Sequence, residues 1–528
     1  MMMTWAGANS RFRRLAVAIC CATLYAPLVA QAEGSSESNL VPTPTLWRAT
    51  TESVELLGGE KMGLLGLDLL FDVNDRLRLG MGTYGAVRGE RGGFITLGLV
   101  GEARQRLSPN WLARAGLFVG AGGGRGGYTL LGGGLSGGGL MLRGDVGLNY
   151  ESGRYGNFGL GVSHVQFPSG VIQSTQPYLQ YEYPFFSLLN PAWTTALPAV
   201  GNATAGDCAV LARSTEFALV TRTYKIPSSV VRDDGLAQHS SMQLLGVEWL
   251  SYLDQHWFLK LESEGAMGGQ SNGYMQILAG GGYRYALSDS TAVKLHAAAG
   301  PAGGGGVDTG GGLLLDAGIS LSQKLSSRTA LELSLGEVHA PSRSFTATSL
   351  GVKLNYQFGL PGVSEQALSW SALSDFDATK LRARVVNQTY FKAAPAWRNR
   401  SVDQSVSNLG VQLDYFVAPN WFVTGQGLAA YAGDAGAYMT GQVGVGLQQP
   451  LSQRWFVEAE ALLGAAGGGG LAVGGGLVGQ GNASIGFRFS NTLSLLVSAG
   501  RVAAPKGDFR ANVAGLALVY QFTGFTHK

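Results

Sequence analysis

The stretch NLGVQLDYF (residues 408–416) decides the fold, because its apolar and polar residues alternate one by one. Val411 and Leu413 fall on one side of an extended chain and Asp414 falls on the other, since successive strand side chains point to opposite faces. TALELSLGEV (residues 329–338) repeats the pattern. Each stretch therefore predicts a β-strand with one apolar face and one polar face.

The pattern recurs in three consecutive units. NWLARAGLFVGAGGGRGG (residues 110–127), STAVKLHAAAGPAGGGG (residues 290–306) and QRWFVEAEALLGAAGGGG (residues 453–470) align with one another. Each unit later ends on an aromatic segment, as in LNYQFGL (residues 354–360) and LVYQFTGF (residues 518–525). Internal similarity of this kind predicts a repeat architecture.

The repeats, a leader and two proline-bearing connections divide the chain into successive segments. The connections contain Pro191 and Pro361, and neither of them alternates clearly. The expected segments are a signal peptide at 1–32, a first unit at 43–185, a linker at 186–213, a second unit at 214–360, a linker at 361–381 and a third unit at 382–525.

Each unit contains about eight alternating segments, near the ~9–11 residues with which a tilted strand crosses a bilayer. The connections between them alternate between short turns, such as LSPNW (107–111), and longer loops, such as PSSVVRDDGLAQHSS (227–241). Trp111 and Trp455 lie at strand ends, where aromatic residues suit a membrane interface. Charged residues are only 14% of the chain, which is a low fraction for the solvent-exposed surface of a soluble β-sandwich. We therefore expect an all-β, antiparallel transmembrane β-barrel protein.

The first residues have the pattern of a secretory signal. Arg13 and Arg14 precede the apolar run LAVAICCATLYAPLVA (15–30), and a small-residue cleavage site follows, with cleavage expected after Ala32. Removal of this segment takes two of the three cysteines with it. Cys208 alone remains, which excludes an intramolecular disulfide in the mature chain.

The signal peptide, strand rhythm, turn asymmetry and terminal aromatic strands together resemble the bacterial outer-membrane β-barrel superfamily. Each unit is similar to a small eight-stranded barrel of the outer membrane protein A or lipid A deacylase type. The resemblance implies a Sec-exported protein of the Gram-negative outer membrane, with outer-membrane lipid and the outer-membrane assembly machinery as partners. It covers nearly the whole mature chain at the level of pattern, and it indicates a class rather than an activity.

Two topologies satisfy this pattern. The units either merge into one barrel of about 24 strands with a wide lumen, or close separately into three tandem barrels of about eight strands whose interiors are filled by side chains. The linkers and the terminal aromatic strand in each unit favour separate closure. The rarity of tandem barrels in one chain favours the merged barrel, which is the topology that we expect.

Alternation also places charged residues of both signs at inward positions. Buried charges must be paired or hydrated, so they either line a wet channel or form ion-pair networks inside closed barrels. A channel predicts a porin-like or export conduit whose selectivity these side chains set. The candidate lumen-lining residues are Arg78, Arg114, Arg143, Asp145, Lys260, Glu262, Lys294, Asp316, Asp414, Glu458, Glu460 and Arg488.

Glycine runs fall between the fifth and sixth predicted strands of every unit. Glycine permits bulges, sharp bends and close backbone approach, so the runs predict either strongly bent hairpins or backbone surfaces that dock against a partner. The second possibility supports an alternative function, a non-conducting scaffold whose hairpins bind an extracellular matrix or fibre component. The candidate hairpin glycines are Gly122, Gly123, Gly124, Gly303, Gly304, Gly305, Gly467, Gly468 and Gly469.

Catalytic chemistry is less well supported. The 6 histidines show no HExxH motif and no paired metal ligands, and we expect no cofactor. His164 lies near the place where the deacylase family has a His-x-Ser pair, but Gln166 stands where that serine would be. A lipid-modifying enzyme is therefore the least favoured hypothesis, and we expect the protein not to be an enzyme. The net charge of +3 does not suggest a nucleic-acid partner.

Overall fold

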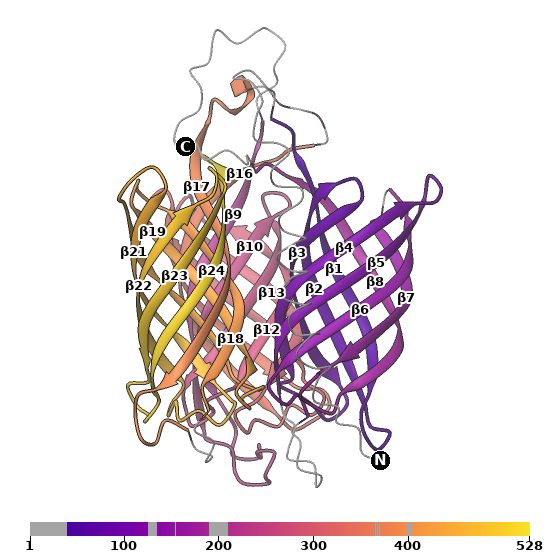
Figure 1. Ribbon diagram of the computed structural model, residues 1–528, viewed down its shortest axis with the longest axis vertical. Coiled ribbons are helices and arrows are strands. Elements are labelled where there is room, and N and C mark those ends of the chain that lie inside the picture. The colour runs from indigo at the N-terminus through magenta and orange to yellow at the C-terminus, as the bar shows by residue number, and fades with distance from the viewer. Residues whose placement is uncertain are drawn as a thin grey trace, which may run out of the picture.

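The computed structural model describes residues 40–124, 135–153, 155–189, 210–364, 366, 368, 370–398 and 404–528. These residues form antiparallel strands in three closed barrels, together with one short 3-10 helix, η2 (Trp370–Leu373). Figure 1 shows the barrels standing side by side. The predicted signal peptide and Cys208 lie outside the described residues.

In every barrel the strands pair in chain order, and the first strand pairs with the last. The first barrel contains β1 (Thr43–Glu55), β2 (Lys61–Asn74), β3 (Leu77–Arg88), β4 (Ile95–Arg106), β5 (Trp111–Gly123), β6 (Leu140–Glu151), β7 (Asn157–Gln166) and β8 (Gln173–Ser187). The second contains β9 (Ala212–Lys225), β10 (Ser241–Tyr252), β11 (Trp257–Gly268), β12 (Met275–Ala286), β13 (Thr291–Gly303), β14 (Leu313–Lys324), β15 (Thr329–His339) and β16 (Thr346–Pro361). The third contains β17 (Phe376–Lys392), β18 (Val406–Phe416), β19 (Trp421–Ala432), β20 (Met439–Pro450), β21 (Trp455–Gly467), β22 (Leu477–Arg488), β23 (Leu493–Ala503) and β24 (Arg510–His527).

The expectation of one merged barrel is wrong. Thr51 of β1 lies opposite Leu179 of β8, so the last strand of the first unit returns to its own first strand. β9 pairs with β16 and β17 pairs with β24 in the same way. A merged barrel would need β8 to form a hairpin with β9, but the chain between Ser187 and Ala212 is long enough to leave both edges free to close within their own units.

The third barrel starts earlier than its predicted boundary. β17 begins at Phe376, inside the segment 361–381 that the sequence pattern assigns to a linker. The early start pairs with an equally long last strand, because Phe376 lies opposite His527 near the end of the chain. Thr526 and His527 thereby continue the strand beyond Phe525.

The outward surface of the barrels is apolar and the inward surface is polar. On β7, Leu160 and Val162 point outward and are 57% and 49% exposed, whereas Ser163, which follows Val162 and points inward, is buried. This distribution is the reverse of that in a soluble sandwich, and it matches a barrel whose outer face contacts lipid. Among the described helices, none is long and apolar enough to cross a membrane.

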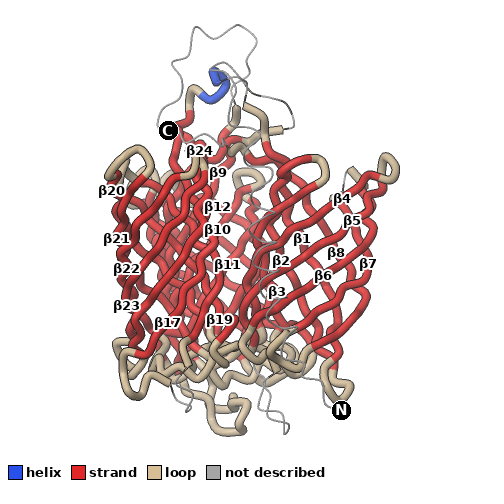
Figure 2. Tube along the Cα trace, viewed as in Figure 1, coloured by secondary structure: helices blue, strands red, loops and turns tan. Residues whose placement is uncertain are grey.

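The two ends of each barrel differ. The linker end, where the first strand begins, has short turns such as the one between β10 and β11. There the Asp254 carboxylate accepts the backbone N–H groups of His256 and Trp257, at 2.7 Å each, and these bonds lower the pKa of Asp254. The glycine end carries the longer loops and the hairpins β5–β6, β13–β14 and β21–β22, and Figure 2 shows loops concentrated there.

Candidate functional site

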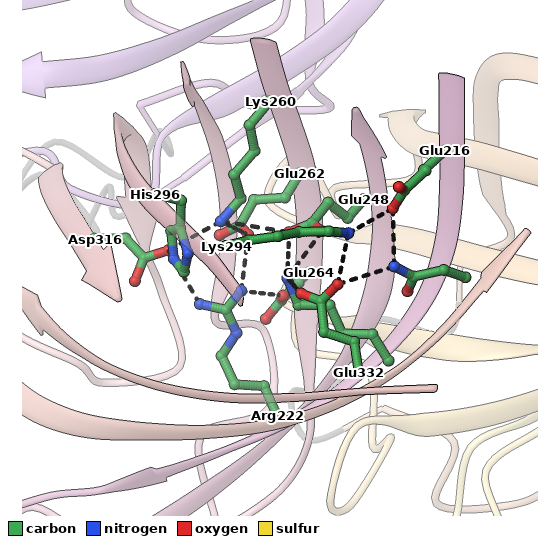
Figure 3. Close-up of polar contacts among 12 residues, drawn as sticks. Glu216, Arg222, Glu248, Lys260, Glu262, Glu264, Lys294, His296, Asp316 and Glu332 are labelled. Atoms are coloured by element: carbon green, nitrogen blue, oxygen red, sulfur yellow. Dashed lines mark hydrogen bonds and ion pairs between the residues drawn. The ribbon is translucent and has the colours of Figure 1, made fainter. Parts of the chain in front are cut away.

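The interior of the second barrel is occupied by one connected network of ion pairs (Figure 3). Arg222 from β9 contacts Glu262 at 2.7 Å and Glu264 at 2.9 Å. Lys260 from β11 contacts Glu262 at 2.8 Å and Asp316 at 3.2 Å. All five side chains are nearly inaccessible to solvent. The charges therefore hold one another in place across the barrel.

The same network continues toward the linker end. Lys294 contacts Glu332 at 2.8 Å, and Lys353 contacts both Glu332 at 3.1 Å and Glu248 at 2.8 Å. Glu248 in turn lies 3.4 Å from Lys260, which joins this part to the first. Lys353 thereby links carboxylates of two strands that do not pair with each other, β10 and β15.

The first barrel is filled in the same manner with arginine as the cation. Arg48 pairs with Asp68 at 2.8 Å, Arg114 pairs with Glu102 at 3.1 Å, and Arg143 pairs with Glu52 at 2.9 Å. The Arg143 guanidinium also lies over the Tyr84 ring, 5.1 Å from its centroid. Arginine suits this position, because its planar group pairs with carboxylates and stacks on aromatic faces.

The third barrel has a smaller network. Arg384 contacts Asp414 and Glu460 at 2.6 Å each, and Arg382 contacts Asp414 at 2.9 Å and also pairs with Glu458. Aromatic rings cover Arg382, whose guanidinium lies 4.7 Å from the centroid of Phe422. The three interiors are thus distinct in sequence and alike in construction.

An apolar layer closes each barrel at the glycine end, next to the charged layer. Two positions recur: the residue just before the fourth strand, which is Phe94, Tyr274 or Tyr438, and the residue just before the eighth strand, which is Ile172, Phe345 or Phe509. All six side chains are at most 1% exposed and belong to the apolar clusters inside the barrels. Loop residues that turn inward therefore seal each barrel.

The predicted lumen-lining residues lie inside the barrels, and all except Arg488 have an ion pair there. All except Arg488 are buried, and Arg488 is half-buried over the ring of Phe456 at 4.8 Å. The buried residues are Arg78, Arg114, Arg143 and Asp145 in the first barrel, Lys260, Glu262, Lys294 and Asp316 in the second, and Asp414, Glu458 and Glu460 in the third.

Several members of these networks were not among the residues predicted from the sequence. They include Arg48 and Glu52 on β1, Arg222 on β9, and Arg382 and Arg384 on β17. These residues lie on the first strand of each unit, where alternation alone could have found them: RARVVNQTYF (382–391) places Arg382, Arg384 and later polar or aromatic residues on one face. The sealing aromatics carry a weaker signal, since each follows a turn rather than a strand.

The glycine runs form contacts between barrels. At the junction of the first and second barrels, Gly92 N–H donates to the Gly310 carbonyl at 2.7 Å, and Gly93 N–H donates to the Ala302 carbonyl at 3.1 Å. At the junction of the first and third, Gly436 N–H donates to the Gly137 carbonyl at 3.2 Å. Such backbone-to-backbone bonds require side chains too small to separate the strands.

The predicted hairpin glycines divide between two tasks. Gly123, Gly303 and Gly467 end the fifth strand of their units, and a Cβ at any of them would overlap the backbone of the neighbouring barrel. A Cβ at the remaining residues would overlap the backbone of their own barrel; these are Gly122, Gly124, Gly304, Gly305, Gly468 and Gly469. These glycines therefore permit close backbone approach, either within one barrel or between two barrels of the same chain.

The junctions close a ring. The fifth strand of each unit packs against the third strand of a neighbouring unit, as β13 against β3, β5 against β19, and β21 against β11. At the centre, Ile95, Ala121, Ile277, Ala429 and Met439 from all three barrels form one apolar cluster. Each contact joins two different surfaces, so it is heterologous. The rotation that relates neighbouring units closes into a ring after three units.

Metal ligands do not gather in the described part of the chain, where no group of three or more His, Cys, Asp or Glu residues is arranged to hold a metal ion.

No family model and no curated protein matches the chain. Solved structures that resemble it include the porin OccK11 (OpdR) of Pseudomonas aeruginosa, with 11% identity, coverage of 92% of this chain and 98% of that one, and a TM-score of 0.21. The siderophore receptor PirA of Pseudomonas aeruginosa has 9% identity, coverage of 92% and 81%, and a TM-score of 0.26. PirA of Acinetobacter baumannii has 8% identity, the same coverage, and a TM-score of 0.26. Likeness at these scores carries no argument about function, and the chain's own strands show the outer-membrane β-barrel fold in the form of three closed units.

Replacement of Arg382 by alanine is expected to destabilise the third barrel by about 3–5 kcal/mol, because Asp414 and Glu458 would lose a buried cation. The measurement is the urea midpoint of refolded protein in detergent micelles. Arg454→Ala, at an exposed turn, is the control and should leave the midpoint unchanged. Equal midpoints for Arg382→Ala and wild type would contradict a structural role for the network.

Replacement of Gly93 by alanine is expected to separate the first and second barrels while each stays folded. The new Cβ would overlap the backbone nitrogen of Gly304 in the other barrel. Gly58→Ala is the matched control, because Gly58 has a similar positive φ of 85° against 82° for Gly93 but has nothing within 4 Å of its Cβ position. Spin labels on β7 and β15 should report a broader distance distribution for Gly93→Ala only.

Proposed function

We propose that the chain is a non-conducting protein of the Gram-negative outer membrane, in which three sealed barrels form a rigid platform that displays loops to an extracellular polymer or fibre. The observation that carries the proposal is that two successive layers of side chains fill the interior of each barrel. A buried ion-pair layer and a buried apolar layer follow one another along every barrel. Eight strands enclose a space just wide enough for such side chains.

The difference between the two ends supports an orientation. Barrels of this class have short periplasmic turns and longer extracellular loops, which places the linker end in the periplasm and the glycine end outside. This orientation agrees with Sec export, signal removal after Ala32 and insertion by the assembly machinery. The start of the first strand and the end of the last strand of each barrel then lie in the periplasm, the side from which insertion starts.

The outer loop between β9 and β10 is the proposed binding surface. Val231 and Leu236 are 41% and 65% exposed there, although they are apolar and lie beyond the strands. Charged residues flank them, with Arg232 pairing with Asp234 at 3.5 Å. The glycine hairpins are less suited to this role than the sequence suggested, because their backbone is engaged between barrels.

A conduit is the second candidate. The observation that favours it is the acid-rich interior of the second barrel, where the carboxylates outnumber the lysine and arginine side chains that they contact. A cation pathway uses such an excess. The apolar seal would have to move before ions could pass.

The proposed function includes no catalysis. His164 lies on the outward face of β7, where its Nδ1 is 2.8 Å from the Thr175 hydroxyl, and no carboxylate of the described residues forms a hydrogen bond with the ring. A general base needs a nucleophile within hydrogen-bond reach and usually a third group that orients it. The side chain has instead the surroundings of a residue at the membrane-facing surface.

Conductance separates the two candidates. Refolded protein in a planar bilayer is expected to give no stepwise current, because both layers of each interior exclude a continuous water path. Phe345→Gly, which opens the apolar seal of the second barrel, tests whether the charged layer alone blocks ions. Stepwise currents from the wild-type protein would reject the proposed function and support the conduit.

Exchange of Val231–Ala237 for a glycine–serine loop is expected to abolish retention of the secreted polymer or fibre by cells that express the protein, since the exposed apolar residues are lost. Heat-modifiable migration on gels verifies that the barrels remain folded. The control exchanges the loop residues 56–60 of the first barrel. Undiminished retention after the first exchange would remove this loop from the proposal.

A further inference from the structure

A pocket with two cations opens on the outside of the first barrel, at its glycine end. Ser53, Lys61, Gly63, Arg88 and Gly89 line a cavity of about 300 Å³. We refer to it as the lysine–arginine pocket. Gly63 brings the strands close here, because a Cβ on it would lie 2.8 Å from the Arg88 Cβ.

The pocket lies at the edge of the membrane-facing surface that is nearest the glycine end. Lys61 and Gly63 share the outward face of β2 with Leu65, Leu67 and Leu69, which are half-buried and apolar. Arg88 lies opposite Gly63 in the register between β2 and β3, and it is exposed. Basic groups thus stand directly beyond an apolar strip, at the level where a bilayer has its headgroups.

Nearby carboxylates are largely engaged elsewhere. Glu60 pairs with Arg91 at 2.5 Å, and Glu90 pairs with Arg343 of the second barrel. Glu55 lies across from Lys61 in the strand register, but the structure records no ion pair between them. Lys61 and Arg88 therefore have no acidic partner among the described contacts.

The other two barrels provide an internal comparison. All three have a bulge at the same place, where Gly63, Gln243 and Ser407 occupy equivalent positions. At the position of Arg88 the second and third barrels have Gly268 and Ala432. At the position of Lys61 they have the equivalents Ser241 and Ser405. The barrel fold does not require the two cations, so another interaction must account for them.

We propose that the lysine–arginine pocket binds the phosphate of an anionic membrane lipid in the leaflet at the glycine end. The Arg88 guanidinium presents a fork of donors to the phosphate oxygens, the Lys61 ammonium adds a second charge, and the Ser53 hydroxyl can donate a hydrogen bond. The acyl chains of the lipid run along Leu65, Leu67 and Leu69. The inference goes beyond the platform function and requires only that the barrel crosses a membrane.

The test uses the full mature chain, reconstituted in phosphatidylcholine vesicles containing phosphatidylglycerol and then released into detergent for native mass spectrometry. Each basic residue near a membrane surface contributes roughly 1 kcal/mol of attraction to anionic lipid, so loss of both should lower phosphatidylglycerol retention by about 10- to 30-fold. The variant Lys61→Ser with Arg88→Ala copies the residue types of the third barrel, which folds without the cations.

Lys506→Ser with Arg510→Ala is the control, because it removes the same charge from exposed positions of the third barrel. Its retention should equal that of the wild type. Equal retention by the pocket variant and the wild type, or an equal loss in the control, would overturn the proposal. If the double variant misfolds, Arg88→Gln alone replaces it and should still lose several-fold.

Inorganic phosphate distinguishes a lipid from a free anion. Calorimetric titration of the detergent-solubilised wild type with inorganic phosphate should show no saturable binding, because the acyl contacts are missing. Binding of inorganic phosphate as tight as that of phosphatidylglycerol would make this a free-anion site and would overturn the lipid assignment.

Discussion

The structure depends on one constraint: a strand edge inside a bilayer cannot leave its N–H and C=O groups unpaired. Each unit meets it within eight strands, because β1 returns to β8, β9 to β16 and β17 to β24. Closure at that size leaves a narrow interior. Since alternation delivers a polar side chain to every second position, the interior must pair its own charges or hydrate them, and the ion pairs of Arg222, Lys260 and their partners are the outcome.

A second consequence concerns how barrels associate. Hydrophobic burial supplies little attraction between surfaces that already contact lipid, so close packing and backbone hydrogen bonds must hold them together. Glycine at Gly93 and Gly436 permits both, and covalent linkage in one chain keeps the barrels at high effective concentration. The glycine content that would indicate disorder in a soluble protein therefore serves contacts between rigid bodies.

Strand content and inward residues could be predicted from the sequence because they follow from a local period of two. Asp414 and Glu458 were found in this way. Separate closure of the barrels could not be predicted, since alternation is identical in the merged and the separate topologies. The strand that pairs with β8 is β1, which lies more than a hundred residues earlier in the chain. The sealing residues could not be predicted for another reason. Phe94, Tyr274 and Tyr438 lie just outside the strands, where the alternation of apolar and polar residues stops. Only their recurrence at one position of each repeat marks them.

Repetition also separates what the fold needs from what a single unit has acquired. Features present three times, such as the sealing aromatics and the glycine that ends each fifth strand, belong to closure and docking. Features present once need another explanation. The Lys61–Arg88 pair is such a feature, because the equivalent positions of the other two barrels hold Ser241 and Gly268, and Ser405 and Ala432. Because the ring keeps all units in one orientation, a loop on one barrel and a basic pocket on another always face the same side of the membrane.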